Sequence, residues 1–125
     1  MPSPVMTKAA GTLLASQTVA AGAAAPLFTL DASAKFEAQI QVQGTFGTVA
    51  AMNGLQLQVF PGVGAGPTYD SIAAATLVIA GTTSTTQQQT IKLPTGMYQF
   101  RVSNLDVTNA ITAVSVTWAS IDSVQ

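Results

Sequence analysis

The sequence predicts an all-β protein, a single β-sandwich of about eight antiparallel strands in a jelly-roll-like arrangement. Apolar and polar residues alternate in "KFEAQIQVQ" (35–43) and in "LQLQVF" (55–60), which is the period of a strand with one buried face. Turn-forming compositions separate such runs at short intervals, and helical periodicity is missing from nearly the whole sequence. An immunoglobulin-like sandwich is the alternative, because these patterns do not distinguish the two topologies.

The individual strands follow from this alternation. The expected strands are 12–19, 26–30, 35–43, 54–60, 71–80, 86–93, 97–103 and 110–121. The run "IAAATLVIA" (72–80) could instead form two helical turns, although the density of β-branched residues rises towards Ile79. The last strand breaks phase between Ala113 and Val114, or again near Ile121, which predicts a bulge.

The connections predict how these strands pair. The short "LPTGM" turn (93–97) favours a hairpin that pairs residues 90–93 with residues 97–100. Two longer links, 44–53 and 61–67, are long enough for Greek-key crossings between the two sheets. Alternation also names the core. The predicted core residues are Phe36, Ile40, Val42, Leu55, Leu57, Val59, Ile91, Leu93, Tyr98, Phe100, Val102, Val114, Val116 and Trp118.

A single domain accounts for most of the chain. At 125 residues the protein is long enough to bury one core without disulfides or metals. We expect residues 1–10 to form an extended N-terminal arm and residues 11–125 to form the sandwich. The stretch 9–25 loosely resembles a signal peptide, but polar residues interrupt its apolar centre, which favours an arm followed by a first strand.

Charge and residue types exclude several functions. Only 7% of residues are charged, and the net charge is −1. The 4 basic residues are scattered, whereas nucleic-acid binding needs a basic cluster, so we expect no nucleic-acid partner. No apolar run approaches the ~18 residues of a membrane span, so we expect no membrane partner. Because His and Cys are both absent, we expect no enzyme and no bound cofactor or metal.

Three local features could bind a small ligand. The "GVGAG" loop (62–66) lacks the Lys-Ser/Thr and the following helix of a phosphate loop, which favours a flexible crossover. Asp106 with Asn104 and Asn109 could hold calcium, although one carboxylate in a turn composition favours an Asx turn. Tyr69, beside the glycine loop, is placed to contact a sugar, so a carbohydrate-binding module is an alternative function.

Uncharged glutamine covers the polar phase of several predicted strands. Lys and Glu repel copies of themselves and guard sheets against association, whereas Gln does not. Its amide both donates and accepts, so it can pair with the same residue of a neighbouring subunit. We therefore predict a protein interface here, with Lys35 and Glu37 at its border. The proposed interface residues are Gln39, Gln41, Gln43, Gln56, Gln58 and Gln99, and Gln87 and Gln89 belong to the same predicted polar face.

Four segments of the sequence also carry a resemblance. They are "TLLASQTV" (12–19), "LFTLDASAKFEAQIQVQG" (27–44), "LQLQVFPG" (55–62) and "LPTGMYQFRVSNLDVTNAITAVSVTWASI" (93–121). Their layout resembles the small all-β virion proteins of tailed bacteriophages and is most similar to capsid cement or decoration proteins. The resemblance implies a jelly-roll-like sandwich without catalytic residues that docks on the outer surface of a capsid and stabilises the shell.

The same resemblance implies partners and a location. It implies assembly as a homo-oligomer, a dimer or trimer, contact with a major capsid protein, and a place on the capsid exterior after synthesis in the host bacterial cytoplasm. The N-terminal arm would reach across subunits, and Pro2, Pro4 and Val5 suit such an extended strap. Neck, tail and baseplate proteins of these viruses use similar sandwiches, so another structural role in the phage is an alternative.

Overall fold

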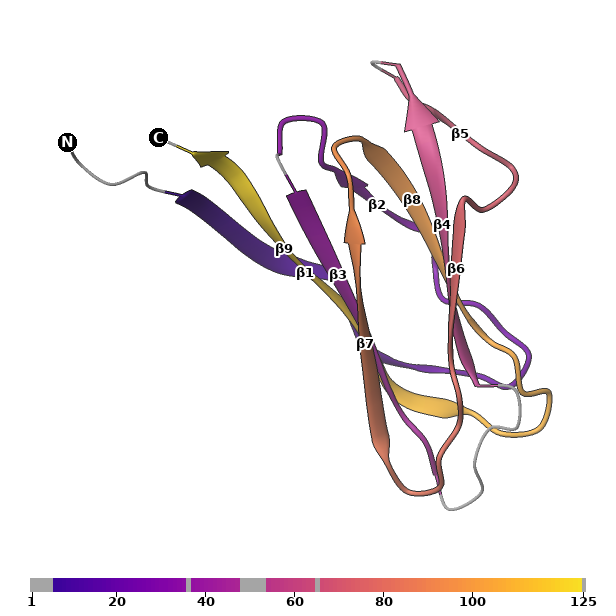
Figure 1. Cartoon of the computed structure of the whole chain (residues 1–125). Helices are drawn as coiled ribbons and strands as arrows, with labels where there is room; N and C mark the ends of the chain where they lie inside the picture. Colours follow the sequence, from indigo (N-terminus) through magenta and orange to yellow (C-terminus); the bar gives the residue numbers. More distant parts are fainter. Residues whose placement is uncertain (1–5, 36, 48–53, 65, 125) are drawn as a thin grey trace.

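In the computed structural model, the chain folds into two facing antiparallel sheets (Figure 1). The structure describes residues 6–35, 37–47, 54–64 and 66–124, with side chains described for residues 8–121 of these ranges. The described residues form nine strands and contain no helix that could cross a membrane. The strands are β1 (Met6–Val19), β2 (Phe28–Asp31), β3 (Glu37–Thr45), β4 (Leu55–Val63), β5 (Thr68–Tyr69), β6 (Ala75–Ile79), β7 (Thr86–Leu93), β8 (Met97–Asn104) and β9 (Ile111–Val124).

Successive strands along the chain mostly belong to different sheets. The first sheet has the strand order β1-β9-β3-β7, and the second has β2-β8-β4-β6, with the short β5 pairing with the far end of β4. The pairs between described strands are all antiparallel. The chain changes sheet at each link between main strands except from β4 to β6, which is the jelly-roll arrangement. The predicted sandwich is therefore confirmed, in its jelly-roll form rather than the immunoglobulin-like alternative.

The predicted strands are present, and β5 is an additional short strand. The run 72–80 contains strand β6 and no helical turn. The predicted break of phase in the last strand is also confirmed. Ala113 has a positive φ of 49°, and the register of β9 with β3 shifts beside it. A second shift, in the register of β9 with β1, lies next to Ile121.

The predicted hairpin at residues 93–97 is wrong. Strand β7 pairs with β3 in the first sheet, whereas β8 pairs with β2 and β4 in the second, so this short turn crosses between the sheets. The N–H of Ala32 donates to the Gly96 carbonyl at 2.8 Å, and the Gly96 N–H donates to the Ala32 carbonyl at 3.3 Å. The turn is thus held by the segment after β2. Because Leu93 and Tyr98 both enter the core, from opposite sheets, their burial overrides the local pairing that a short turn permits.

Of the two predicted crossings, one is confirmed. Residues 44–53 connect β3 in the first sheet to β4 in the second. Residues 61–67 make no crossing, because β4 continues to Val63 and pairs there with β5. Gly64, with a φ of 98°, supplies the backbone conformation of that turn, which residues with a side chain rarely adopt.

The core lies between the two sheets, and most of the predicted core residues are buried in it. Ile91 and Trp118 are only partly buried and pack against its margin, and Phe36 lies outside the described residues. Alternation missed several buried residues because they lie at strand ends, in edge strands or in turns, where the polar and apolar phases are hard to read. These residues include Leu14, Val19, Leu30, Phe46, Ile79 and Ile111.

The N-terminal part of the chain belongs partly to the first sheet. Strand β1 begins at Met6 and pairs with β9, so residues 6–10 of the predicted arm form part of the sheet edge. Pro2, Pro4 and Val5 lie outside the described residues. Their role as a strap stays a prediction, as does the boundary between an arm and a sandwich.

Candidate functional site

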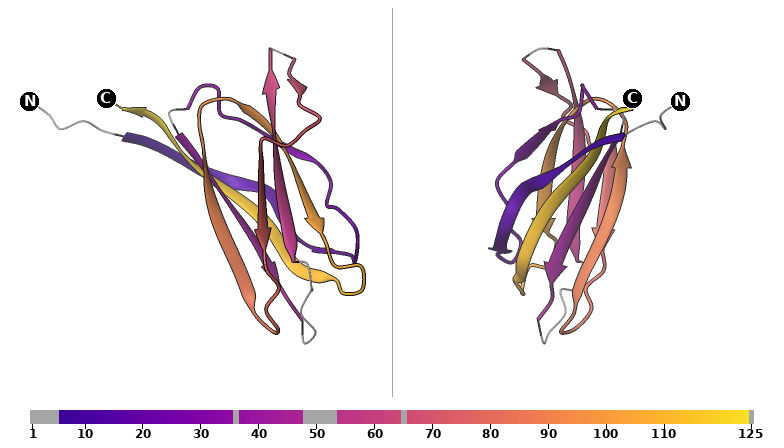
Figure 2. Two further views of the ribbon diagram at one scale, coloured as in Figure 1. Left: turned by 45° about the vertical axis from the view of Figure 1, so that its right-hand side comes forward. Right: turned by 90° about the vertical axis from the view of Figure 1, so that its left-hand side faces the viewer.

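The outer surface of the first sheet is a broad face of uncharged polar residues. Figure 2 (right) shows its four strands side by side, with β1 and β7 at the two edges. The pairing of the strands aligns its side chains in rows across the sheet: Gln43 lies between Gln88 and Ser115, Gln41 between Thr90 and Thr117, and Gln39 between Lys92 and Ala119. We call this surface the glutamine–threonine face. It consists of Thr12, Gln39, Gln41, Gln43, Thr45, Thr86, Gln88, Thr90, Thr112, Ser115, Thr117 and Ala119.

Hydrogen bonds between neighbouring strands order part of this face. The Gln41 amide nitrogen donates to the Thr90 hydroxyl at 3.4 Å. The hydroxyls of Thr45 and Thr86 lie 2.9 Å apart and share a hydrogen bond. Each glutamine amide has two N–H groups and an oxygen that accepts, so these bonds leave further donors and acceptors at the surface. The face can therefore bond to another polar surface without removing a charge from water.

Charged side chains are confined to one end of the face. Lys92 and Glu37 form an ion pair with 3.5 Å between Nζ and Oε1, and both side chains reach water. Exposed pairs of this kind contribute little to stability, about 0 to 1 kcal/mol. Glu37 therefore marks the border of the uncharged surface, as the sequence suggested. Lys35 lies elsewhere, with its Nζ 5.0 Å from the centre of the Trp118 ring.

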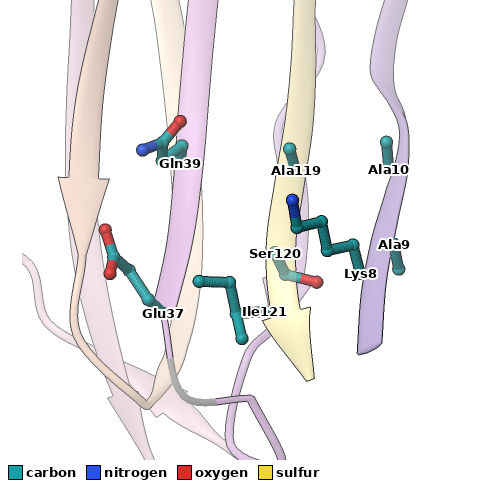
Figure 3. A pocket seen from close by; sticks show the side chains of 8 residues that line it. All are labelled: Lys8, Ala9, Ala10, Glu37, Gln39, Ala119, Ser120 and Ile121. Atoms are coloured by element: carbon teal, nitrogen blue, oxygen red, sulfur yellow. The ribbon is translucent and has the colours of Figure 1, made fainter. Parts of the chain in front are cut away.

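Two adjoining hollows run along the β1 side of the face. The first, of about 490 Å³, lies among β1, β9 and β3 (Figure 3). The second, of about 560 Å³, continues from it towards Thr90, and both include Ala10, Gln39 and Ala119. Small residues on β1 and β9 leave this space open. Lys8 and Glu37 line only the first hollow, so the second is lined by uncharged residues.

The predicted interface residues do not form one surface. Gln39, Gln41 and Gln43 belong to the glutamine–threonine face. The other three, Gln56, Gln58 and Gln99, alternate with buried residues of β4 and β8, so they lie on the outer surface of the second sheet. The core separates these two surfaces, which face opposite ways. A single contact with another protein can therefore use one set of three glutamines and not both.

Two further glutamines of the predicted polar face are also misplaced. In the pairing of β7 with β3, Gln87 lies opposite Gly44 and Gln89 lies opposite Val42. Gly44 and Val42 are both buried and belong to the side of β3 that faces the core. These glutamines therefore lie on the inner phase of β7. They remain partly or fully exposed because β7 is the edge strand of its sheet. A sign of this is visible in the sequence, because "QQQ" (87–89) breaks the alternation of polar and apolar residues.

The outer surface of the second sheet is less uniform than the glutamine–threonine face. The guanidinium carbon of Arg101 lies 5.7 Å from the centre of the Phe60 ring, an arrangement of the cation–π type. Val78, 47% exposed, adds an apolar side chain to the same surface. The two outer surfaces thus differ in chemistry, and a protein interface on either of them stays a prediction.

The Asn104, Asp106 and Asn109 cluster is an Asx turn that joins three segments. Asp106 Oδ1 accepts from the N–H groups of Thr108 at 2.6 Å and Asn109 at 3.0 Å. The Asn104 amide donates to the carbonyls of Asn109 and Val19 at 2.7 and 3.3 Å. The described residues contain no group of three His, Cys, Asp or Glu that could hold a metal ion. The cluster is explained by these bonds within the chain.

The aromatic residues considered for sugar binding lie in different places. Tyr98 is buried, and its hydroxyl donates to the Pro94 carbonyl at 2.7 Å. Tyr69 packs so closely against Gly62 that a Cβ atom added to the glycine would lie 2.6 Å from the tyrosine ring. Trp118 packs against Gly11 in the same way; it lies opposite the buried Ile40, so its ring is on the inner side of β9, at the margin of the core. None of the three aromatic rings therefore lies on the glutamine–threonine face.

Comparison with solved structures finds a similar fold in viral proteins. A chain of the infectious bursal disease virus Gx strain matches with a TM-score of 0.52 and 14% identity, over 97% of this chain and 34% of that one. The VP2 subviral particle of infectious bursal disease virus matches with a TM-score of 0.50 and 12% identity, over 95% of this chain and 33% of VP2. This chain thus spans about a third of the length of these viral chains. At such identities the likeness shows the fold alone.

A domain of a xylanase also matches, at a lower TM-score. The CBM36-1 domain of a multidomain xylanase from the hindgut metagenome of Trinervitermes trinervoides has a TM-score of 0.49 and 7% identity, over 90% of this chain and 96% of that domain. No protein-family model matches the sequence, and no curated protein matches it either. The viral matches and this chain therefore have the fold in common, a jelly-roll-like β-sandwich.

Proposed function

We propose that the protein is a non-enzymatic structural component of a virion that docks on the outer surface of a tailed-phage capsid and stabilises the shell. The observation that carries this proposal is the glutamine–threonine face, which is uncharged from Thr86 on β7 to Thr12 on β1. A surface meant only for water usually carries Lys and Glu, which discourage association. A surface of amides and hydroxyls suits contact with another protein, because its groups exchange hydrogen bonds without the cost of burying charge.

The size of the face supports many weak contacts rather than one strong contact. β3 has nine residues; at about 3.3 Å per residue and about 4.8 Å per strand, four such strands outline roughly 570 Å². This is less than the ~800 Å² per partner of an ordinary stable interface. A regular shell offers the same site many times, so modest contacts suffice when neighbouring copies also contact one another. The likeness to infectious bursal disease virus VP2 adds that this fold occurs in a protein of a viral particle.

The test is binding to empty capsids of the phage whose genome carries the coding sequence. We expect the chain to sediment with these capsids and to raise the temperature at which they disrupt. In the double variant Gln41→Lys with Gln43→Lys, unpaired charges enter the contact, and binding should weaken by at least about tenfold. The matched control, Gln56→Lys with Gln58→Lys, makes the same change on the opposite surface and should bind normally.

Each other outcome is informative. Loss of binding in the control pair alone would mean that the second sheet makes the contact. A folded chain that does not bind these capsids at all would overturn the shell-docking proposal and leave a neck, tail or baseplate position to be tested.

The second hollow supports a second candidate function, binding of a carbohydrate. Its volume of about 560 Å³ lies within the usual range of ligand sites. Amide and hydroxyl groups of Gln41, Thr90 and Thr117 surround it, and such groups bond to sugar hydroxyls. Trp118, the only tryptophan of the chain, lies on the inner side of the same sheet, so its fluorescence reports on this site indirectly, through the strand β9 that it shares with Thr117. A saturable change with an oligosaccharide, retained in Tyr69→Ala and lost in Gln41→Ala, would favour this function over shell docking.

A further inference from the structure

Strand β7 is an open edge of the first sheet (Figure 2, right). Its eight residues pair with β3 from Leu93 opposite Ala38 to Thr86 opposite Thr45 without any shift in register. Within the described residues, no other strand pairs with its outer side. Alternate N–H and C=O groups of β7 therefore point outward, in the regular spacing that another strand needs for pairing.

The other edges of the two sheets are less suited to pairing. β1 pairs with β9 through four shifts in register over the described strands, and such bulges bend an edge and interrupt its ladder. In the second sheet, β2 has four residues and β6 has five, so both offer short edges. β7 has no shift in its register with β3 and, at eight residues, is longer than the edges of the second sheet. Its sequence, "TQQQTIKL", has no proline and carries a single charge, at Lys92.

We propose that β7 pairs with β7 of a second copy of this chain, antiparallel and across a two-fold axis. The occupant is a second copy because the edge is complementary to itself. In every antiparallel register centred between Thr86 and Ile91, Lys92 faces an uncharged residue of the other copy, so no like charges meet. Gln88 and Gln89 lie near the axis, and glutamine amides form hydrogen-bonded ladders with one another across paired strands.

This pairing would also enlarge the proposed docking surface. An antiparallel edge pair has its two-fold axis perpendicular to the sheet, so both glutamine–threonine faces point the same way. Two faces side by side outline roughly 1,100 Å², which exceeds the ~800 Å² of an ordinary interface on one partner. The dimer is inferred from the edge itself and does not require the shell. Its test uses the isolated chain, so its failure and the failure of shell docking are distinguishable.

Lysine substitutions at the edge test the pairing in solution. Native mass measurement and sedimentation velocity of the full chain should show a dimer. In Gln88→Lys with Gln89→Lys, positive charges meet across the axis, and we expect the dimer dissociation constant to rise by at least about tenfold. Thr18→Lys adds a charge to β1, the other edge of the same sheet, and should leave the dimer unchanged. Thermal unfolding confirms that each variant is folded.

Single cysteines then locate the contact. The chain has no cysteine, so each introduced thiol reports on its own position. A disulfide between two copies requires Cβ atoms within about 4.5 Å. We expect Gln88→Cys or Gln89→Cys to form a covalent dimer under mild oxidation, at concentrations where Thr18→Cys remains monomeric.

The outcomes separate cleanly. A dimer that weakens only with the β7 lysines and cross-links through β7 supports the proposal. A monomer at high concentration, a trimer, or an oligomer that responds to Thr18→Lys and ignores the β7 lysines would overturn it.

Discussion

Replacing Asn104 tests whether one buried amide joins the end of β1 to the turn between β8 and β9. Its Nδ2 donates to the carbonyl of Asn109 at 2.7 Å and to those of Val19 and Ala20 at 3.3 and 3.4 Å. Its Oδ1 accepts from the Asp106 N–H at 3.0 Å, and the residue is 2% exposed. Leaving one buried polar group without a partner costs about 1 to 3 kcal/mol. Asn104→Ala leaves at least two such groups without a partner, so we expect the free energy of unfolding to fall by about 3 kcal/mol.

This loss should be visible in thermal unfolding. An unfolding entropy of about 2.1 cal/mol/K per residue converts it into a fall in Tm of roughly 11 °C for this chain length. Tryptophan fluorescence and circular dichroism should give the same midpoint if unfolding is two-state. Gln39→Ala, which removes an exposed amide, is the matched control and should change stability by less than about 0.5 kcal/mol.

Asn104→Asp separates the hydrogen bonds from the packing. The carboxylate has nearly the same shape as the amide but cannot donate to three carbonyls, so it should be less stable than Asn104→Ala at neutral pH. Burial and these carbonyls would raise the pKa of the new carboxyl above its unfolded value, so the variant should regain stability as the pH falls. An Asn104→Asp variant as stable as the wild type at neutral pH would refute this role of the amide. A rise in Tm on adding calcium would refute the Asx-turn interpretation of the cluster.

Two further substitutions test the core. Phe100 is fully buried and stacks on Phe28 with 5.2 Å between ring centres, so Phe100→Ala should lower stability by about 3 to 5 kcal/mol in urea unfolding, and Phe100→Leu by clearly less; equal effects would mean that the site collapses freely. Burial raises the pKa of Tyr98 above its ordinary value of 10.0. The stabilisation of the folded state by the neutral phenol is therefore complete below about pH 10 and is lost as the pH rises through the raised pKa. Tyr98→Phe removes the hydrogen bond to Pro94, should cost about 0.5 to 1.5 kcal/mol at neutral pH, and should make the decline in stability above pH 10 shallower; an unchanged decline would assign it to another group.

The alternation of residues predicted most of the fold because a half-buried strand imposes it directly. It located β3, β4 and β8 and most of their core residues, and the break of phase at Ala113 predicted the bulge. Pairing between strands was harder to predict. A short turn such as 93–97 fits both a hairpin and a crossing, and the choice depends on where Leu93 and Tyr98 find the rest of the core.

The glutamines lie on two separate surfaces because the strands that carry them belong to different sheets. A crossing at 44–53 places the strands before and after it in different sheets. Gln41 and Gln58 therefore had to point in opposite directions once both strands directed their apolar residues inward. Residue patterns describe each strand separately, whereas membership of a common surface depends on sheet assignment.

The central position of β9 sets the order in which this protein can fold. β9 lies between β1 and β3, and it pairs Met6 with Val124 and Glu37 with Ile121. During synthesis, β1 and β3 leave the ribosome long before the strand that joins them, so the first sheet is completed only after the last strand is available. Contacts this distant in sequence favour slow folding, on a scale of milliseconds to seconds. Until then β1 and β3 lack their common neighbour, and crowded nascent chains would be most prone to pair with one another at this stage.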